Sequence, residues 1–220
     1  MNWKDEGYLL SKNNFSENSI IIETFTLEHG KASGIVYGGS SQKEKKKFQI
    51  GNKILLNWKS KNANSMGYFT TELLNPISPL FFDNKKKSIC ILSASTILKI
   101  LLPERQINKK IYNSFEELLS SLAYENWINF YIHWELFLIK ELGFEINFLN
   151  KKSFENKTIE INNKFFKIPQ LLIDNNKSNV TDSSVKEALE FNKSILIENF
   201  ILPNRLRMPL SRNILEKYFS

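Results

Sequence analysis

The sequence has one cysteine, two histidines and no long apolar run, and each scarcity excludes a class of protein. A single thiol cannot form a disulfide within the chain or a zinc site built from several cysteines. No apolar stretch reaches the roughly 18 residues that a membrane span needs, and no signal-peptide core follows the polar start of the chain. We therefore expect a cytoplasmic protein, with Cys90 buried as a structural side chain in the apolar residues 88–92.

The sequence also lacks the motifs of several large enzyme classes. It contains neither G-x-x-x-x-G-K-[ST] nor G-x-G-x-x-G, whose glycine-rich loops hold nucleotide phosphates, and no G-x-S-x-G nucleophile turn. His133, Trp134 and Glu135 match the H-x-E half of the zinc-deaminase signature, but the P-C-x-x-C half is missing. These absences favour a binding protein over an enzyme, and we expect neither a metal nor another cofactor.

Positive charge, in contrast, is in excess. The chain has 30 Lys and Arg against 23 Asp and Glu, which gives a net charge of +7. Such a charge fits an anionic partner such as nucleic acid. An AT-rich genome would also raise the lysine content, but it would scatter lysines along the chain. Clusters of basic residues are therefore more informative than their total.

The densest basic cluster follows the turn signal at residues 38–39 and lies between two strand-like segments. It has four lysines in five positions, namely Lys43, Lys45, Lys46 and Lys47. Such a loop either contacts phosphates or is a solvated run of charge on the surface. A second cluster consists of Arg205, Arg207 and Arg212. Their guanidinium groups suit bidentate phosphate contacts and equally the capping of helix C-termini.

The hydrophobic pattern divides the chain into two parts. Residues 1–76 contain five strand-like segments, at residues 8–11, 19–27, 31–37, 53–59 and 66–74. Six of the eight glycines lie near the ends or bends of these segments, which suits a tightly curved barrel. Five short strands with one basic loop predict an OB-like barrel, although an SH3-like barrel would give a similar pattern.

Prolines at positions 76 and 79 end the strand pattern, and a helical period follows. We predict helices at residues 93–102, from a capping box at Ser114 to Gly143 with a possible break, from a capping box at Ser184 to about residue 200, and after Pro209. A small hairpin is predicted at residues 158–168. Trp127 and Trp134 have helical spacing and are expected in the core rather than as base-stacking platforms.

The predicted fold class is therefore α+β. An N-terminal, five-stranded OB-like β-barrel at residues 1–76 is followed by a mainly α-helical domain at residues 77–220, with a small lobe near residues 145–172.

Several segments also match a known family in order and spacing. In the first part they are residues 3–10 (WKDEGYLL), 22–31 (IETFTLEHGK), 38–41 (GGSS), 48–52 (FQIGN) and 66–73 (MGYFTTEL). In the second part they are residues 134–144 (WELFLIKELGF) and 209–212 (PLSR). Together these segments resemble the RecO family of recombination-repair mediators, and the resemblance covers nearly the whole chain.

The resemblance implies an N-terminal OB domain and a C-terminal helical domain, in agreement with the pattern. It implies a nucleoid-associated mediator of recombinational DNA repair that binds single- and double-stranded DNA and anneals complementary strands. The implied protein partners are the tail of SSB (the single-stranded DNA-binding protein), RecR and, with RecR, a RecA-loading assembly. An RNA-binding or ribosome-associated OB protein is the main alternative, and a protein-interaction scaffold is the next.

The resemblance also bears on two sites in the helical part. His133, with Lys140 as a helper, is the candidate contact for the SSB tail, and the alternative is a histidine packed in the core. Many relatives carry a four-cysteine zinc lobe after the helix that ends here at Gly143. Residues 145–152 contain no cysteine, so we expect no metal in this chain.

Overall fold

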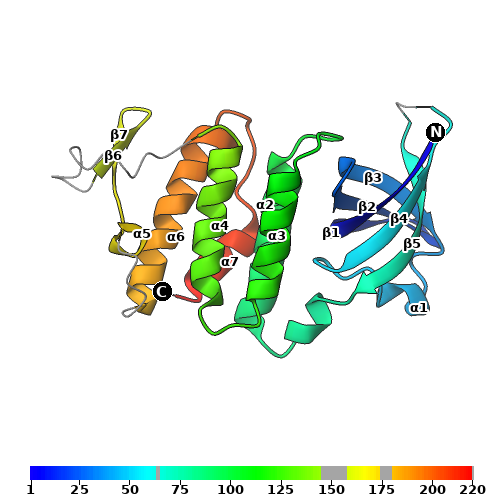
Figure 1. Ribbon diagram of the computed structural model, residues 1–220, viewed down its shortest axis with the longest axis horizontal. Coiled ribbons are helices and arrows are strands. Elements are labelled where there is room, and N and C mark those ends of the chain that lie inside the picture. Colours follow the sequence, from blue (N-terminus) through cyan, green and yellow to red (C-terminus); the bar gives the residue numbers. More distant parts are fainter. Residues whose placement is uncertain (63–64, 145–157, 174–179, 220) are drawn as a thin grey trace. The chain divides into compact units, whose positions relative to one another are not determined.

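The computed structural model describes residues 1–62, 65–144, 158–173 and 180–219. The chain divides into two compact units, Met1–Leu119 and Ser120–Ser220. The first holds a β-barrel with helices beside it, and the second is mainly helical (Figure 1). In the described parts of the chain, no helix is long and apolar enough to cross a membrane.

Five strands form the barrel: β1 (Asn2–Ser16), β2 (Ser19–Thr26), β3 (Gly30–Tyr37), β4 (Lys53–Lys59) and β5 (Gly67–Asn75). The barrel is closed in the order β1-β2-β3-β5-β4, and β4 pairs with β1. The β3–β5 pair is parallel and the others are antiparallel. This arrangement confirms the OB-like barrel that the sequence predicts.

The first strand is much longer than predicted, and its buried carboxylate has partners. Asp5 is buried, and its carboxylate accepts hydrogen bonds from the backbone N–H groups of Glu6 and Glu28, each at 2.8 Å. It also accepts one from the His29 ring at 2.9 Å. A buried carboxylate whose hydrogen bonds are all satisfied in this way can lie within a strand. A prediction from the hydrophobicity pattern alone leaves such a charged residue out of the strand.

The barrel closes at a short seam where two glycines allow β3 and β5 to approach. Gly34 pairs with Gly67, and only one further residue pair joins these strands. A Cβ atom at Gly34 would lie 2.6 Å from the Phe69 ring, and one at Gly67 would lie 2.3 Å from the Trp58 ring. Both distances are too short for a side chain, so the core rings fill the space beside the seam.

The described residues of the first unit also contain α1 (Gln42–Lys45), η1 (Ser78–Phe81), α2 (Lys85–Leu101) and most of α3 (Lys109–Ser121). α2 begins earlier than predicted because the Asn84 side chain caps it by accepting from the Lys87 N–H. Cys90, on this helix, is buried as predicted.

The predicted capping box at Ser114 is wrong. The Asn108 side chain instead accepts from the Ile111 N–H at 2.9 Å, next to the start of α3. Ser114 lies inside the helix, where its hydroxyl donates to the Ile111 carbonyl. The Ser and Glu with capping-box spacing lie inside this helix, so the motif predicted the start of the helix at a turn that is in its interior.

The barrel packs closely on α3. The rings of Tyr8 and Phe115 are 5.2 Å apart, and those of Phe25 and Tyr112 are 5.6 Å apart. Glu116 of α3 accepts hydrogen bonds from the Tyr8 hydroxyl and the Lys53 ammonium, each at 2.7 Å. The first compact unit therefore includes α2 and most of α3, whereas the domain boundary at residue 76 stays a prediction from the sequence.

The second unit contains α4 (Trp127–Glu141), β6 (Thr158–Ile161), β7 (Lys164–Lys167), α5 (Gln170–Ile173), α6 (Asp182–Leu196), the π-helical turn η3 (Ile197–Ile201) and α7 (Leu210–Lys217). The break expected in the long helical run lies between Ser121 and Trp127. α4 ends as predicted at Gly143, whose φ of 99° is the left-handed conformation that glycine favours.

The hairpin β6–β7 confirms the prediction at residues 158–168. Its two turn residues, Asn162 and Asn163, have φ values of 50° and 62°, as a type I′ turn requires. Residues 145–157 of the predicted lobe lie outside the described residues.

The capping box predicted to begin at Ser184 is wrong in its register. Thr181 is the N-cap of α6, and Ser184 occupies the third helical position. Each side chain accepts from the other residue's backbone N–H, at 3.2 Å and 3.0 Å. Trp127 and Trp134 of α4 are buried, in agreement with their predicted place in the core.

Candidate nucleic-acid interface

The basic loop between β3 and β4 is held on the barrel by local hydrogen bonds. Gly38 has a φ of 74°, and Ser41 then caps the single turn of α1 by accepting from the Glu44 N–H. The Ser40 hydroxyl donates to the Glu17 carbonyl at 2.7 Å, and the Gln49 amide donates to the Lys45 carbonyl at 3.1 Å. The loop thus presents its lysines from a defined short helix.

Three of the four predicted lysines reach solvent. Lys43, Lys45 and Lys46 are exposed, whereas the Lys47 side chain is only 19% exposed. The Lys47 ammonium lies 2.6 Å from the Glu44 carboxylate and donates to the Thr71 carbonyl of β5 at 2.8 Å. Lys47 therefore fastens the loop to the barrel, and its charge is already partly neutralised.

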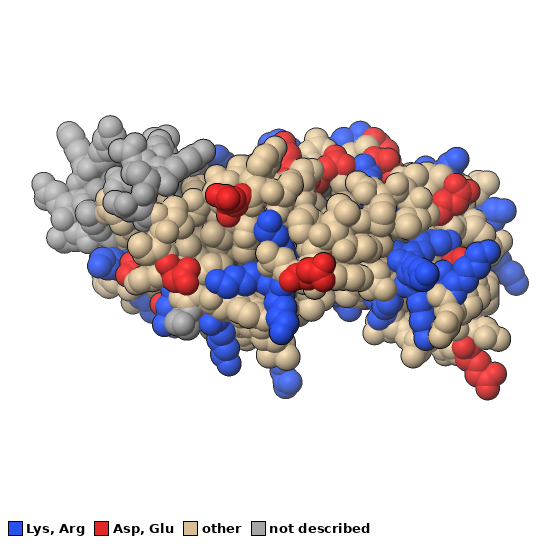
Figure 2. All heavy atoms as spheres, turned by 90° about the horizontal axis from the view of Figure 1, so that it is seen from below, with Lys and Arg blue, Asp and Glu red and all other residues tan. Residues whose placement is uncertain are grey.

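Lys12 of β1 joins this surface, although its place in the sequence gives no sign of it. Lys12 as a whole residue is exposed. The pKa of its ammonium group is lowered, first by partial loss of solvent around that group and then by the nearby charge of Lys45. The two ammonium groups are close enough to repel each other, and a bound anion would relieve that repulsion. We define the basic surface as Lys12, Lys43, Lys45 and Lys46. Figure 2 shows Lys and Arg side chains gathered over the barrel on the face that is seen from below.

The arginine cluster is divided by burial. Arg205 and Arg207 are exposed on the segment after η3. Arg212, in contrast, is 0% exposed, so its prediction as a phosphate contact does not fit the structure. A guanidinium without access to solvent cannot reach a DNA backbone.

Arg212 forms the centre of a buried polar network. Its Nε and Nη2 atoms donate to the Glu135 carboxylate at 2.5 and 3.1 Å, and Nη2 also donates to the Leu189 carbonyl. The same carboxylate accepts from the Tyr131 hydroxyl at 2.7 Å and the Asn192 amide at 3.2 Å. Burial alone would lower the pKa of Arg212, but Glu135 outweighs it and raises that pKa.

The candidate contacts for the SSB tail both lie on the surface of α4. His133 and Lys140 are exposed, and their spacing of seven residues places them on one face of the helix. The His133 Nδ1 atom lies 2.8 Å from the Asn129 carbonyl. His133 is therefore not a packed core histidine, which was the alternative that the sequence left open.

A cleft of about 170 Å³ lies beside the β2–β3 turn and is lined by Trp3, His29, Trp58 and Arg105 among others. The Trp3 ring stacks with two others, with centroid distances of 4.3 Å to His29 and 5.6 Å to Trp58. The Trp3 ring therefore already has stacking partners within the protein.

Within the described ranges, no group of three or more His, Cys, Asp or Glu side chains could hold a metal ion. A lobe with four cysteine ligands does not fit this chain, because its single cysteine is buried in α2.

The comparison with known proteins covers most of the chain. The family described as "Recombination protein O N terminal" matches residues 1–77, and the one described as "Recombination protein O C terminal" matches residues 84–197. The first match coincides with the barrel strands, and the second includes α2, α3, α4 and α6.

Individual relatives agree with these matches. A "DNA repair protein RecO" of Cereibacter sphaeroides is 35% identical over 148 residues, which are 67% of this chain and 62% of the relative. A protein of the same name from a Wolbachia of Drosophila simulans is 32% identical over 149 residues, which are 67% of this chain and 61% of the relative. The matched part thus spans about three-fifths of the length of these relatives. The chain belongs to the recombination protein O (RecO) family.

Proposed function

We propose that this protein acts in recombinational DNA repair by binding DNA through the basic surface of its OB-like barrel. The observation that carries the proposal is the set of three exposed lysines in the loop that carries α1, joined by Lys12 from β1. The name of its relatives, DNA repair protein RecO, supports the same role. Arg205 and Arg207 are candidate second contacts because both are exposed.

The chemistry of the basic surface suits contacts with phosphates rather than with base edges. Lysine ammonium groups release the counterions that condense on DNA, so binding should be weakly dependent on sequence and strongly dependent on salt. Neutralised phosphates also lessen the repulsion between two strands. We therefore propose that the protein binds single- and double-stranded DNA and anneals complementary strands.

The partner proteins follow from the resemblance to the family and from the surface of α4. We propose that His133 and Lys140 meet the acidic tail of SSB, because the exposed ammonium group of Lys140 complements acidic side chains and His133 is exposed on the same helix face. Cooperation with RecR in loading RecA, and association with the nucleoid, belong to the same proposal.

The test is to remove the three exposed lysines of the loop that carries α1 and measure binding to a single-stranded oligonucleotide at several salt concentrations. In the Lys43→Ala, Lys45→Ala, Lys46→Ala variant we expect a weaker affinity and a slope of log K against log salt that is smaller by about 2, because each phosphate contact on a single strand contributes about 0.7. Lys47 is kept, because it anchors the loop.

The control variant replaces three other exposed lysines by alanine, so that it loses the same charge outside the basic surface. They are Lys110, Lys167 and Lys217. The control variant should retain the wild-type salt slope. If both variants lose affinity and slope equally, the net charge rather than the basic surface binds DNA. A preference for structured RNA over DNA, without annealing of complementary strands, would favour the RNA-binding alternative.

A further inference from the structure

Two tyrosines lie exposed on the outer face of the barrel. The side chains of Tyr37, at the end of β3, and Tyr68, in β5, belong to residues that are 68% and 39% exposed. Their ring centroids are 6.1 Å apart, and the ring planes are inclined by 52°. The two rings are therefore neighbours that are inclined to each other, and both reach solvent.

Strand register extends these rings into an apolar strip. Tyr68 is the partner of Ile35 on β3, and Ile35 is in turn the partner of Ile21 on β2. Paired residues project from the same face of a sheet, and both isoleucines are half-buried. The strip thus crosses three strands on the face that contains β2 and β3, where OB-folds bind oligonucleotides.

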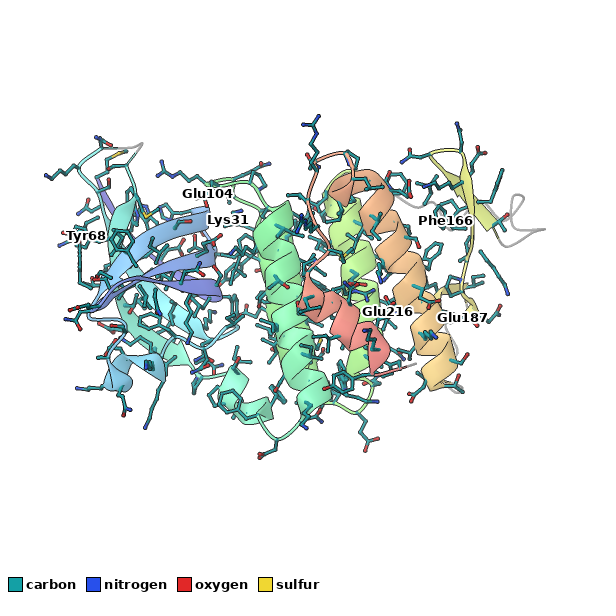
Figure 3. The ribbon with its side chains drawn as sticks, turned by 180° about the vertical axis from the view of Figure 1, so that it is seen from behind. Lys31, Tyr68, Glu104, Phe166, Glu187 and Glu216 are labelled. Atoms are coloured by element: carbon teal, nitrogen blue, oxygen red, sulfur yellow. The ribbon has the colours of Figure 1, made fainter. Side chains whose placement is uncertain are left out.

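Lysines border the strip on two sides. On β4, the exposed Lys59 is the direct partner of Tyr68. On the other side, the loop that carries α1 begins immediately after Tyr37, and Lys47 ties the end of that loop to Thr71 of β5. Figure 3 shows Tyr68 at the outer side of the barrel, away from Lys31 and Glu104 at the other end. An apolar strip that carries two exposed aromatic rings between cationic groups is complementary to a strand with flat bases and a phosphate backbone.

We propose that Tyr37 and Tyr68 form a stacking platform for the unpaired bases of single-stranded DNA, with Lys59 and the basic surface taking the phosphates on either side. This proposal rests on the proposed function and deepens it, because it assigns a strand preference to the barrel. In a duplex each base face is covered by its neighbours, so only single strands can use the platform. The Trp3 cleft is less suitable, because the Trp3 ring already stacks with His29 and Trp58.

The experiment compares two double variants. Tyr37→Leu with Tyr68→Leu keeps an apolar surface but removes the flat rings, whereas Tyr37→Phe with Tyr68→Phe keeps the rings and removes only the hydroxyls. We expect the leucine variant to lose about tenfold or more in affinity for an oligonucleotide without secondary structure. Its affinity for a duplex of the same length should stay within about twofold of wild type, and the phenylalanine variant should bind both as wild type does.

The salt dependence separates this site from the lysines. Stacking releases no counterions, so the leucine variant should keep the wild-type slope of log K against log salt. Equal single-strand affinity in the leucine variant and wild type would overturn the platform while leaving DNA binding intact. An equal loss for single strands and duplexes, or a smaller salt slope, would also overturn it. If the wild type binds no DNA at low salt, both the proposed function and the stacking platform are wrong.

Discussion

Arg207 and Arg212 lie close in the sequence, but one is a surface residue and the other belongs to a buried polar network. Arg207 is exposed, whereas Arg212 has its guanidinium satisfied by Glu135, Leu189 and Glu216 without contact with solvent. The sequence shows the cluster of arginines. It cannot show that Arg212 is buried in contact with Glu135, which lies 77 positions away. The same limit hid Lys12, because only the barrel brings it near Lys45.

The difference between the two arginines is measurable as stability. Arg212→Met leaves the buried Glu135 carboxylate without its counter-ion, and losing one partner of a buried pair costs about 3–5 kcal/mol. Arg207→Met, on the surface, should change the free energy of unfolding by less than about 0.5 kcal/mol. Urea unfolding of both variants checks this. Similar stabilities of the two variants would show that the Arg212–Glu135 pair is dispensable.

At the scale of elements, the strands were more predictable than the starts of the helices. The alternation in β4 places Ile54, Leu56 and Trp58 in the core, and the pattern alone predicted its bounds. Helix starts failed because Ser-x-x-Glu occurs both at caps and inside helices, as Ser114 shows. The role of Glu116 was equally hidden, since its partners Tyr8 and Lys53 come from distant strands.

The contacts of Glu116 predict how stability depends on pH. Burial alone would raise the pKa of Glu116, but hydrogen bonds from Lys53 and Tyr8 and the charge of Lys53 lower it overall. A carboxyl whose pKa is lowered on folding adds stability above its unfolded pKa of about 4.3, and that stability is lost as pH falls through the folded pKa. The pKa of Lys53 is raised on folding. The stability that its charged form contributes is therefore lost only as pH rises beyond about 10.4.

Glu116→Gln should therefore lose less stability than wild type between about pH 5 and pH 3. Thermal unfolding at a series of pH values measures this difference. Glu117→Gln, on an exposed position of the same helix, is the control and should keep the wild-type acid dependence. If Glu116→Gln loses stability in acid as steeply as wild type, the contact between α3 and the barrel does not depend on the ionised carboxyl.

For the whole molecule, the sequence predicted the order of β-barrel and helices but not how far the first compact unit extends. The change from strand to helix period is visible near residue 76, whereas the compact unit continues to Leu119. Side chains of the barrel are covered by later residues, since Tyr8 and Phe25 both contact the Tyr112 ring. The Lys31 ammonium also donates to the Lys99 carbonyl of α2 at 2.8 Å. A change in periodicity locates a change of element, not the limit of a core.

A pair of fragments tests the limit of the first unit. A fragment of residues 1–76 exposes the faces of Tyr8 and Phe25 that α3 covers, whereas a fragment of residues 1–119 keeps them buried. Covering even part of two such rings is worth about 2 kcal/mol or more. In a domain of this size we expect the shorter fragment to unfold at least roughly 10 °C lower, as followed by circular dichroism. Equal midpoints would instead place the boundary of the folding unit at residue 76 and make α2 and α3 a separate addition to a barrel that is stable alone.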